Sequence, residues 1–198
     1  MSDRLSNETA RPSGITSPIS LAHVVLQTSR MDEQVAWYET VLNARTVYAN
    51  AGGAFLAYDE EHHRVAFVNI PDLDNKAKKS SGVNHIAFSY RTLEDLLNNY
   101  VRLEKLGIMP AWSVNHGMTT SLYYNDPDGN HVELQVDNFD DPREAAEYMF
   151  SEAFAENMIG VDIDPHDLRR RMLAGEDMAS LLRRPPSRPR GMETVPLL

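Results

Sequence analysis

The fold is decided by two stretches, Ile19-Ser-Leu-Ala-His23-Val-Val-Leu26 and Gly82-Val-Asn-His85-Ile-Ala-Phe88. Both are short runs of aliphatic and β-branched residues, which is typical of buried strands. Each carries one histidine, and the two histidines lie 62 residues apart (85 − 23). Similarity at a fixed period predicts a repeated structural unit. Each stretch is therefore interpreted as the first strand of one copy.

The residues after each stretch follow the same plan. Met31–Leu42 has the spacing of an amphipathic helix, and so does the segment from Thr92, a plausible N-cap, to Leu106, which Gly107 ends. Strand-like runs follow the two helices at 45–48, 54–58, 64–70, 110–114, 120–124 and 130–136. The turn Asp126-Pro-Asp-Gly129 joins the last two runs.

The pattern predicts an α+β fold, with two tandem βαβββ modules that form a metal-binding cavity. The modules span residues 18–72 and 82–138, within a domain at 18–140, and a linker rich in Lys and Ser joins them. Residues 1–17 are polar and are predicted to be disordered. Residues 141–182 have the pattern of a helical extension, and the Arg- and Pro-rich residues 183–198 are predicted to be a flexible tail.

The composition excludes several classes of function. There is no cysteine, so disulfides, cysteine-ligated metals and a thiolate nucleophile are ruled out. The formal net charge of −10 would repel nucleic acid and anionic membranes, and neither is an expected partner. The N-terminus shows no apolar signal segment, and no stretch has the length of a membrane helix. We therefore expect a cytoplasmic protein.

His23, His85 and Glu133 are the candidate metal ligands. A histidine in an apolar strand is usually a core residue, but the equivalence of His23 and His85 under the repeat favours a shared role. Modules packed about a pseudo-twofold axis would bring their first strands, and hence both imidazoles, together. Glu133 lies in an apolar strand, where an unpaired carboxylate is costly; a solvent-facing glutamate is the alternative. Two imidazoles and one carboxylate suit Fe(II) and O2 chemistry, and Mn(II) fits the same ligands.

Three further residues are candidates for the same cavity. His62 and His63 are adjacent at the start of a predicted strand, where neighbours face opposite ways, so only one can face the cavity. Two solvated turn histidines are the alternative. Tyr123 lies in a predicted strand and could offer its phenol to the cavity, with a core position as the alternative. His116 precedes the same strand.

The stretch Val114-Asn-His116-Gly-Met-Thr-Thr-Ser-Leu122-Tyr123-Tyr-Asn-Asp126-Pro127-Asp-Gly129-Asn-His-Val-Glu133 resembles the fingerprint of type I extradiol catechol dioxygenases, in the vicinal oxygen chelate superfamily. A histidine, a hydrophobic-Tyr pair, an acidic-Pro-x-Gly turn and a glutamate at these spacings are far more specific than any one of them. His62-His63-Arg-Val-Ala66 resembles the segment that holds the family's catalytic histidine. The resemblance covers residues 18–140.

The resemblance implies a role for each candidate. His23, His85 and Glu133 match the family's Fe(II) ligands, and His63 matches its acid/base histidine. His116 and Tyr123 match the residues that hydrogen-bond substrate and intermediates. The implied activity is ring cleavage of a catechol by O2 in aromatic catabolism. The apolar and aromatic side chains expected around the cavity favour an aryl or polycyclic diol. A homodimer through the helical extension or the sheet edges is expected. The chain departs from well-known members in having one pair of modules instead of two.

Other members of the superfamily are the alternatives. A glyoxalase or epimerase needs a carboxylate in the last strand of the first module, and Val65-Ala-Phe-Val-Asn-Ile70 has none. A fosfomycin-type transferase needs a basic cluster for a phosphonate, and few basic residues lie near the predicted cavity. A non-catalytic small-molecule binding protein would not need all six candidate residues.

Overall fold

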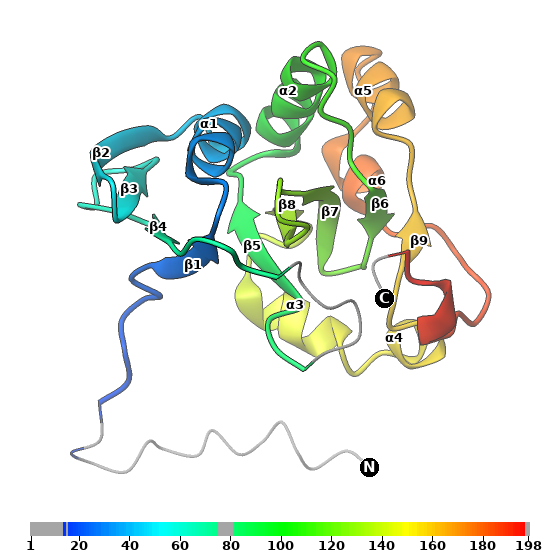
Figure 1. Ribbon diagram of the computed structural model, residues 1–198. Coiled ribbons are helices and arrows are strands. Elements are labelled where there is room, and N and C mark those ends of the chain that lie inside the picture. Colours follow the sequence, from blue (N-terminus) through cyan, green and yellow to red (C-terminus); the bar gives the residue numbers. More distant parts are fainter. Residues whose placement is uncertain (1–13, 15, 75–80, 197–198) are drawn as a thin grey trace.

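The computed structural model describes residues 14, 16–74 and 81–196, and Figure 1 shows two sheets joined through helices. Residues 1–13, 15, 75–80 and 197–198 fall outside the described residues. They include most of the N-terminal segment that is predicted to be disordered and most of the linker between the modules. The N-terminal module consists of β1 (Val24–Thr28), α1 (Met31–Leu42), β2 (Arg45–Asn50), β3 (Gly53–Ala57) and β4 (Val65–Asn69). The C-terminal module consists of β5 (His85–Ser89), α2 (Leu93–Glu104), β6 (Trp112–Asn115), β7 (Thr119–Asn125) and β8 (His131–Asp137).

The two sheets share one topology, which confirms the α+β fold and the two βαβββ modules. The first sheet has the order β1-β4-β3-β2, and the second has the order β5-β8-β7-β6-β9. In each module the first strand pairs in parallel with the last, Val25 with Ala66 and Ala87 with Glu133. Since Ala87 follows Val25 by 62 residues (87 − 25), Ala66 occupies the position in its module that Glu133 occupies in the other.

The helix α2 forms because its N-terminus is capped and one of its faces is apolar. The Thr92 side chain accepts a hydrogen bond from the Asp95 amide, which satisfies a free donor of the first turn of α2. Residues from both helices and both sheets form one core. Its largest fully buried side chains include Tyr38 of α1 and Tyr100 of α2. The core therefore ties the two modules of one chain together.

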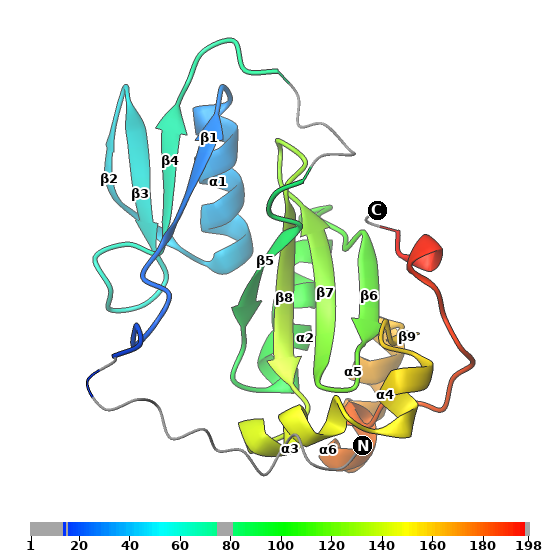
Figure 2. The ribbon, with the colours of Figure 1, turned by 90° about the horizontal axis from the view of Figure 1, so that it is seen from below.

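The contact between the modules differs from the predicted one. The helices α1 and α2 pack together, and α1 lies between the two sheets (Figures 1 and 2). Arg102 and Asn99 of α2 donate to the backbone carbonyls of Thr40, at 2.6 Å, and Val41, at 3.2 Å. The strands β1 and β5 do not pair, so each is an edge of its sheet. The expectation that one chain brings its two first strands together is wrong, because the helices form the junction.

The turn Asp126-Pro-Asp-Gly129 adds a second contact between the modules. Asp128 accepts hydrogen bonds from Arg30 at 3.0 Å and Gln34 at 2.6 Å. Tyr38 donates to Asp126 at 3.3 Å, and both side chains are buried. The segment between β7 and β8 is therefore more than a tight turn: its carboxylates hold the N-terminal module.

Residues 141–196 wrap around the C-terminal module (Figure 2). Their elements are α3 (Pro142–Tyr148), α4 (Glu152–Glu156), β9 (Val161–Asp162), α5 (Pro165–Leu173), α6 (Met178–Leu182) and a short 3-10 helix (Met192–Thr194). The strand β9 extends the second sheet by pairing with β6. Residues 183–196, predicted to be a flexible tail, contact the rest of the extension: Arg184 donates to the Asn157 carbonyl and Arg190 to Asp162 of β9, each at 2.6 Å.

Among the described residues, no helix combines the length and apolar character that crossing a bilayer requires.

Candidate active site

His85 and Glu133 lie side by side on the second sheet. His85 Nε2 is 3.0 Å from Glu133 Oε2, and the Glu133 side chain is only 5% exposed. His85 Nδ1 contacts Asn84 Oδ1 at 2.8 Å, and since an amide oxygen only accepts, Nδ1 carries the proton. The lone pair of a neutral His85 then faces a carboxylate oxygen. Two electron-rich atoms at this distance need a cation between them, so the pair fits a metal ion or a proton.

The surroundings of Glu133 favour its charged form. Burial raises the pKa of this carboxyl, but a hydrogen bond from Ser121, together with one from His85 when His85 holds the shared proton, outweighs burial and holds the pKa below its usual range. The register explains the geometry, because Glu133 lies directly opposite Tyr123 on β7 and Ala87 on β5. The small Ala87 side chain leaves space beside the carboxylate.

Tyr123 and His116 form a second pair next to Glu133. The Tyr123 hydroxyl is 3.0 Å from His116 Nε2, and the Tyr123 ring lies edge-on to His85 at 5.3 Å. Burial and the nearby Glu133 carboxylate raise the pKa of Tyr123, so the phenol keeps its proton. Burial lowers the pKa of His116, which is therefore neutral at pH 7. One neutral imidazole and one phenol thus lie beside the carboxylate.

The other two candidates lie together on the N-terminal module. His23 immediately precedes β1, and its ring centroid is 4.4 Å from that of His63. Phe55 of β3 packs edge-on against His63 at 5.0 Å. The prediction that His62 and His63 face opposite ways is wrong, because their rings lie 4.5 Å apart. They belong to a bend before β4 and not to the strand itself.

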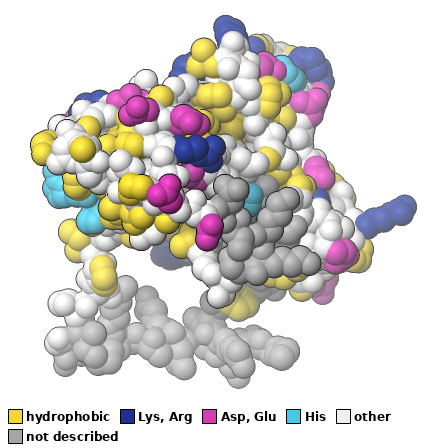
Figure 3. All heavy atoms as spheres, viewed as in Figure 1, with side chains coloured by type: hydrophobic (Ala, Val, Ile, Leu, Met, Phe, Trp, Pro, Cys, Tyr) yellow, Lys and Arg dark blue, Asp and Glu magenta, His cyan; other side chains and the backbone are white. Residues whose placement is uncertain are grey.

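The face of the first sheet that carries these histidines is open and apolar. Val25 is 52% exposed, Tyr48 57% and Phe55 37%, and the register places all three in one row across the sheet. Figure 3 shows histidine side chains gathered at the end of this module, beside exposed hydrophobic side chains. The equivalent row of the second sheet carries Glu133 and Tyr123, and both are buried.

One chain therefore brings together four of the six candidates in one group and two in another. Among the described residues, no three His, Asp or Glu side chains are placed to hold one metal ion. His85 and Glu133 fit as two ligands of the predicted three, and His23 belongs to the other group. Within one chain the predicted cavity is not enclosed.

A cavity lies away from these residues. It has a volume of about 600 Å³ and lies between Gly117, Tyr148 of α3 and the segment around Arg184. None of the six candidate residues lines it. Its size alone does not identify it as the active site, because the side chains with shifted pKa values that lie together are Glu133, Tyr123 and His116.

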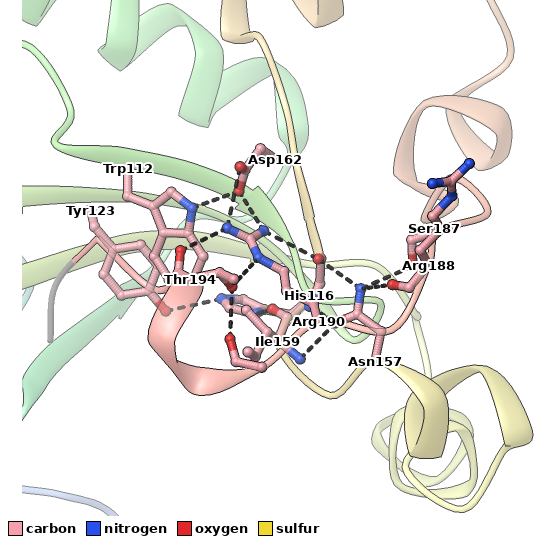
Figure 4. Close-up of polar contacts among 12 residues, drawn as sticks. Trp112, His116, Tyr123, Asn157, Ile159, Asp162, Ser187, Arg188, Arg190 and Thr194 are labelled. Atoms are coloured by element: carbon pink, nitrogen blue, oxygen red, sulfur yellow. Dashed lines mark hydrogen bonds and ion pairs between the residues drawn. The ribbon is translucent and has the colours of Figure 1, made fainter.

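Residues beyond the six candidates surround the site, and those in the C-terminal extension were not predicted from the sequence. Trp112 stacks on Tyr123 at 5.1 Å, and the Ile159 carbonyl contacts His116 Nδ1. Arg190 lies over the Trp112 ring (Figure 4). Ile159 and Arg190 come from the C-terminal extension, which carries no recognisable motif, so only the three-dimensional structure identifies them.

Comparisons with known proteins show the family of the chain. The profile of the Glyoxalase/Bleomycin resistance protein/Dioxygenase superfamily matches residues 20–134. Biphenyl-2,3-diol 1,2-dioxygenase 2 of Rhodococcus globerulus is 46% identical over 162 residues, which are 81% of this chain and 85% of the relative. Biphenyl-2,3-diol 1,2-dioxygenase 3 of the same organism is 45% identical over 83% of this chain and 87% of the relative.

A solved structure gives the same fold. The crystal structure of a glyoxalase/dioxygenase from Nostoc punctiforme matches with a TM-score of 0.53 and 16% identity, covering 62% of this chain and 96% of that one. The matched profile spans both histidine strands and ends one residue beyond Glu133, at residue 134. The chain belongs to the glyoxalase/bleomycin resistance protein/dioxygenase superfamily.

Proposed function

We propose that this chain is an Fe(II)-dependent extradiol dioxygenase, which uses O2 to open the ring of a catechol beside its two hydroxyl groups. The two Rhodococcus globerulus relatives are dioxygenases of a biphenyl diol. Their identity over most of the chain supports an aryl catechol as substrate. A cytoplasmic location, as the sequence predicts, is part of the proposal.

The proposal rests mainly on one observation: the side chains of His85 and Glu133 face each other. A lone pair held 3.0 Å from a buried carboxylate is an arrangement that a divalent cation stabilises. His23, His85 and Glu133 are the proposed ligands, with Mn(II) as the alternative ion. When bound, the ion would lower the pKa of a catechol hydroxyl and transfer electron density from the ring to O2.

The remaining candidates would handle protons and orientation. Tyr123 is protonated and buried, so it can donate a hydrogen bond to a catechol oxygen beside Glu133. His116 is neutral and can first accept a proton at Nε2, the atom that contacts the Tyr123 hydroxyl, and then deliver it from the same atom. His63, beside His23, is proposed as the acid/base group on the opposite side of the site.

Ala66 argues against the glyoxalase alternative. It occupies the position in the first module that Glu133 occupies in the second. A four-ligand site of the glyoxalase type needs a carboxylate there, and a methyl group cannot bind a metal ion. A three-ligand site leaves positions open for a diol and O2, which is what ring cleavage needs.

A second copy of the chain would complete the site. His23 and His63 lie beside an open apolar sheet face, and β1 and β5 each have one edge with no pairing strand among the described residues. If β1 of one copy lies beside β5 of the other, His23 of the first copy meets His85 and Glu133 of the second. A twofold axis would then generate two equivalent sites. Completion of the metal site would thus be the chemical reason for the predicted homodimer.

Isotopically labelled dioxygen tests the reaction class. With biphenyl-2,3-diol as substrate, both labelled oxygen atoms are expected in one ring-opened product, with one O2 consumed per catechol. The measurement is mass spectrometry of the product together with an oxygen electrode. A product that carries no label, or an unlabelled quinone, would contradict the proposed reaction.

Two adjacent tyrosines provide a matched test of the role of Tyr123. Tyr123→Phe is expected to lower kcat about tenfold to a hundredfold, because the hydrogen bond that orients the substrate is lost. Tyr124 points into the core, and its hydroxyl has no partner among the described residues. Tyr124→Phe is therefore expected to leave kcat unchanged and thermal stability equal or higher. Equal activity of the two variants would show that Tyr123 has no role in turnover.

A further inference from the structure

The C-terminal segment 187–195 lies against the candidate site at Trp112. Arg190 is its main contact: the guanidinium lies 5.7 Å from the centroid of the Trp112 ring. The Arg190 side chain is 15% exposed, and Arg190 lies just before the 3-10 helix Met192–Thr194. Val195 of the same segment packs against the cluster of Trp112, Tyr123 and Ile159. Residues predicted to form a flexible tail thus cover one side of the site (Figure 4).

Asp162 links Arg190 and Trp112. Its Oδ1 accepts from Arg190 Nη1 at 2.6 Å and from Trp112 Nε1 at 2.8 Å, and its Oδ2 accepts from Arg190 Nη2 at 3.2 Å. A guanidinium paired with both oxygens of a carboxylate is a strong and directional contact. Arg190 also donates to the Thr194 hydroxyl and carbonyl, at 2.7 and 3.1 Å, which closes the segment on itself. The Trp112 ring is therefore held by its edge and by its face.

Trp112 in turn packs against both proposed proton-handling groups. It stacks on Tyr123 with an interplanar angle of 24° and meets the His116 ring edge-on at 5.5 Å. His116 is fixed from another side by the carbonyl of Ile159, two residues before β9. This contact keeps the proton on Nδ1 and leaves Nε2 free to accept from Tyr123. The extension thus contacts Tyr123 and His116 through Trp112 and Ile159.

We propose that Arg190 is a positioning residue for the reaction: through Asp162 and Trp112 it holds Tyr123 and His116 in their working geometry. The inference rests on the proposed function for its effect on turnover, but not for its effect on Trp112. Arg190 touches neither of the proposed metal ligands of this module, so its loss should leave metal binding intact. The docked segment is thereby a part of the active site and not an independent tail.

The test uses the full chain with Trp37→Phe as background, which leaves Trp112 as the only tryptophan. Arg190→Ala is expected to lower kcat about tenfold, with unchanged iron content, because a small displacement of an orienting group is costly. Quenching of Trp112 fluorescence by acrylamide is expected to rise, since the indole loses its cover. Arg190→Lys keeps a charge for Asp162 but not the fork, and both effects should be intermediate.

The matched control is Arg188→Ala, which removes the same charge from an exposed side chain of the same segment. It should change neither kcat nor quenching. In the double variant Arg190→Ala with Asp162→Asn, the two kcat losses should be less than multiplicative, because both act through Trp112.

Two results would overturn the proposal. One is unchanged quenching of Trp112 in Arg190→Ala, whatever the activity. The other is increased quenching with wild-type kcat, which would mean that Trp112 does not position the catalytic groups. If instead the unsubstituted protein shows no dioxygenase activity but Arg190→Ala still exposes Trp112, the proposed function fails and the contact itself stands.

Discussion

Glu133→Gln is expected to leave the purified protein nearly free of iron and without ring-cleaving activity. Glutamine has the size of glutamate and can still bond to His85, so the fold should persist. Its neutral amide cannot balance the charge of a divalent ion, and the loss of metal affinity should exceed about a hundredfold. The measurement is the iron content after anaerobic loading with Fe(II) and desalting, followed by kcat with a catechol.

Asp137→Asn is the matched control for this substitution. Asp137 is an exposed carboxylate at the end of β8, the same strand that carries Glu133. The same chemical change at this position should alter neither iron content nor kcat. Circular dichroism of both variants should match the unsubstituted protein. Normal iron content in Glu133→Gln would refute the ligand assignment, whatever its activity.

Two inactive variants are expected to restore activity when they are combined in one dimer. His23→Ala removes a proposed ligand from the N-terminal module, and Glu133→Ala removes one from the C-terminal module. If each site takes one module from each copy, the mixed dimer has one site with both ligands missing and one site intact. About half of the wild-type activity per dimer should then return. The mixed dimer can be isolated by giving each copy a different affinity tag.

The reciprocal combination separates a shared site from a site within one chain. A copy with both substitutions, paired with an unsubstituted copy, disables both sites if they are shared. The same dimer keeps about half of its activity if each chain builds its own site, since one chain is intact. An inactive first pair together with a half-active second pair would contradict the two-copy site and leave the reaction class untouched.

Much of the fold follows from the sequence, because the signals are local. The two histidine strands, the helix cap at Thr92 and the turn at Asp126–Gly129 all depend on residues close together in the chain. The grouping of His116, Tyr123 and Glu133 follows too, because β7 and β8 form a hairpin and place Tyr123 opposite Glu133. A strand register fixes which side chains share a face.

The packing of the modules could not be predicted in the same way. The open edges of β1 and β5 are compatible with pairing inside one chain or between two, and the sequence of a strand does not encode which. The choice is made by the contact of α1 with α2 and by the bonds of Asp128 to the first module.

Long-range contacts of single residues could not be predicted from the sequence either. Arg190 lies 78 residues after Trp112 (190 − 112), in a stretch whose prolines predict no regular structure. Its guanidinium donates to Asp162, which lies beside β6 because β9 pairs with that strand. His62 and His63 differ from the prediction for a local reason: side chains alternate between two faces in a strand, but these two residues lie in a bend.

The most direct test of the account is oxygen uptake by the iron-loaded protein. The protein is loaded anaerobically with Fe(II), mixed with biphenyl-2,3-diol or another catechol, and then exposed to air. We predict O2 consumption that matches the appearance of a yellow ring-opened product. Bound iron with no O2 uptake across a panel of catechols would contradict the assignment as an extradiol dioxygenase.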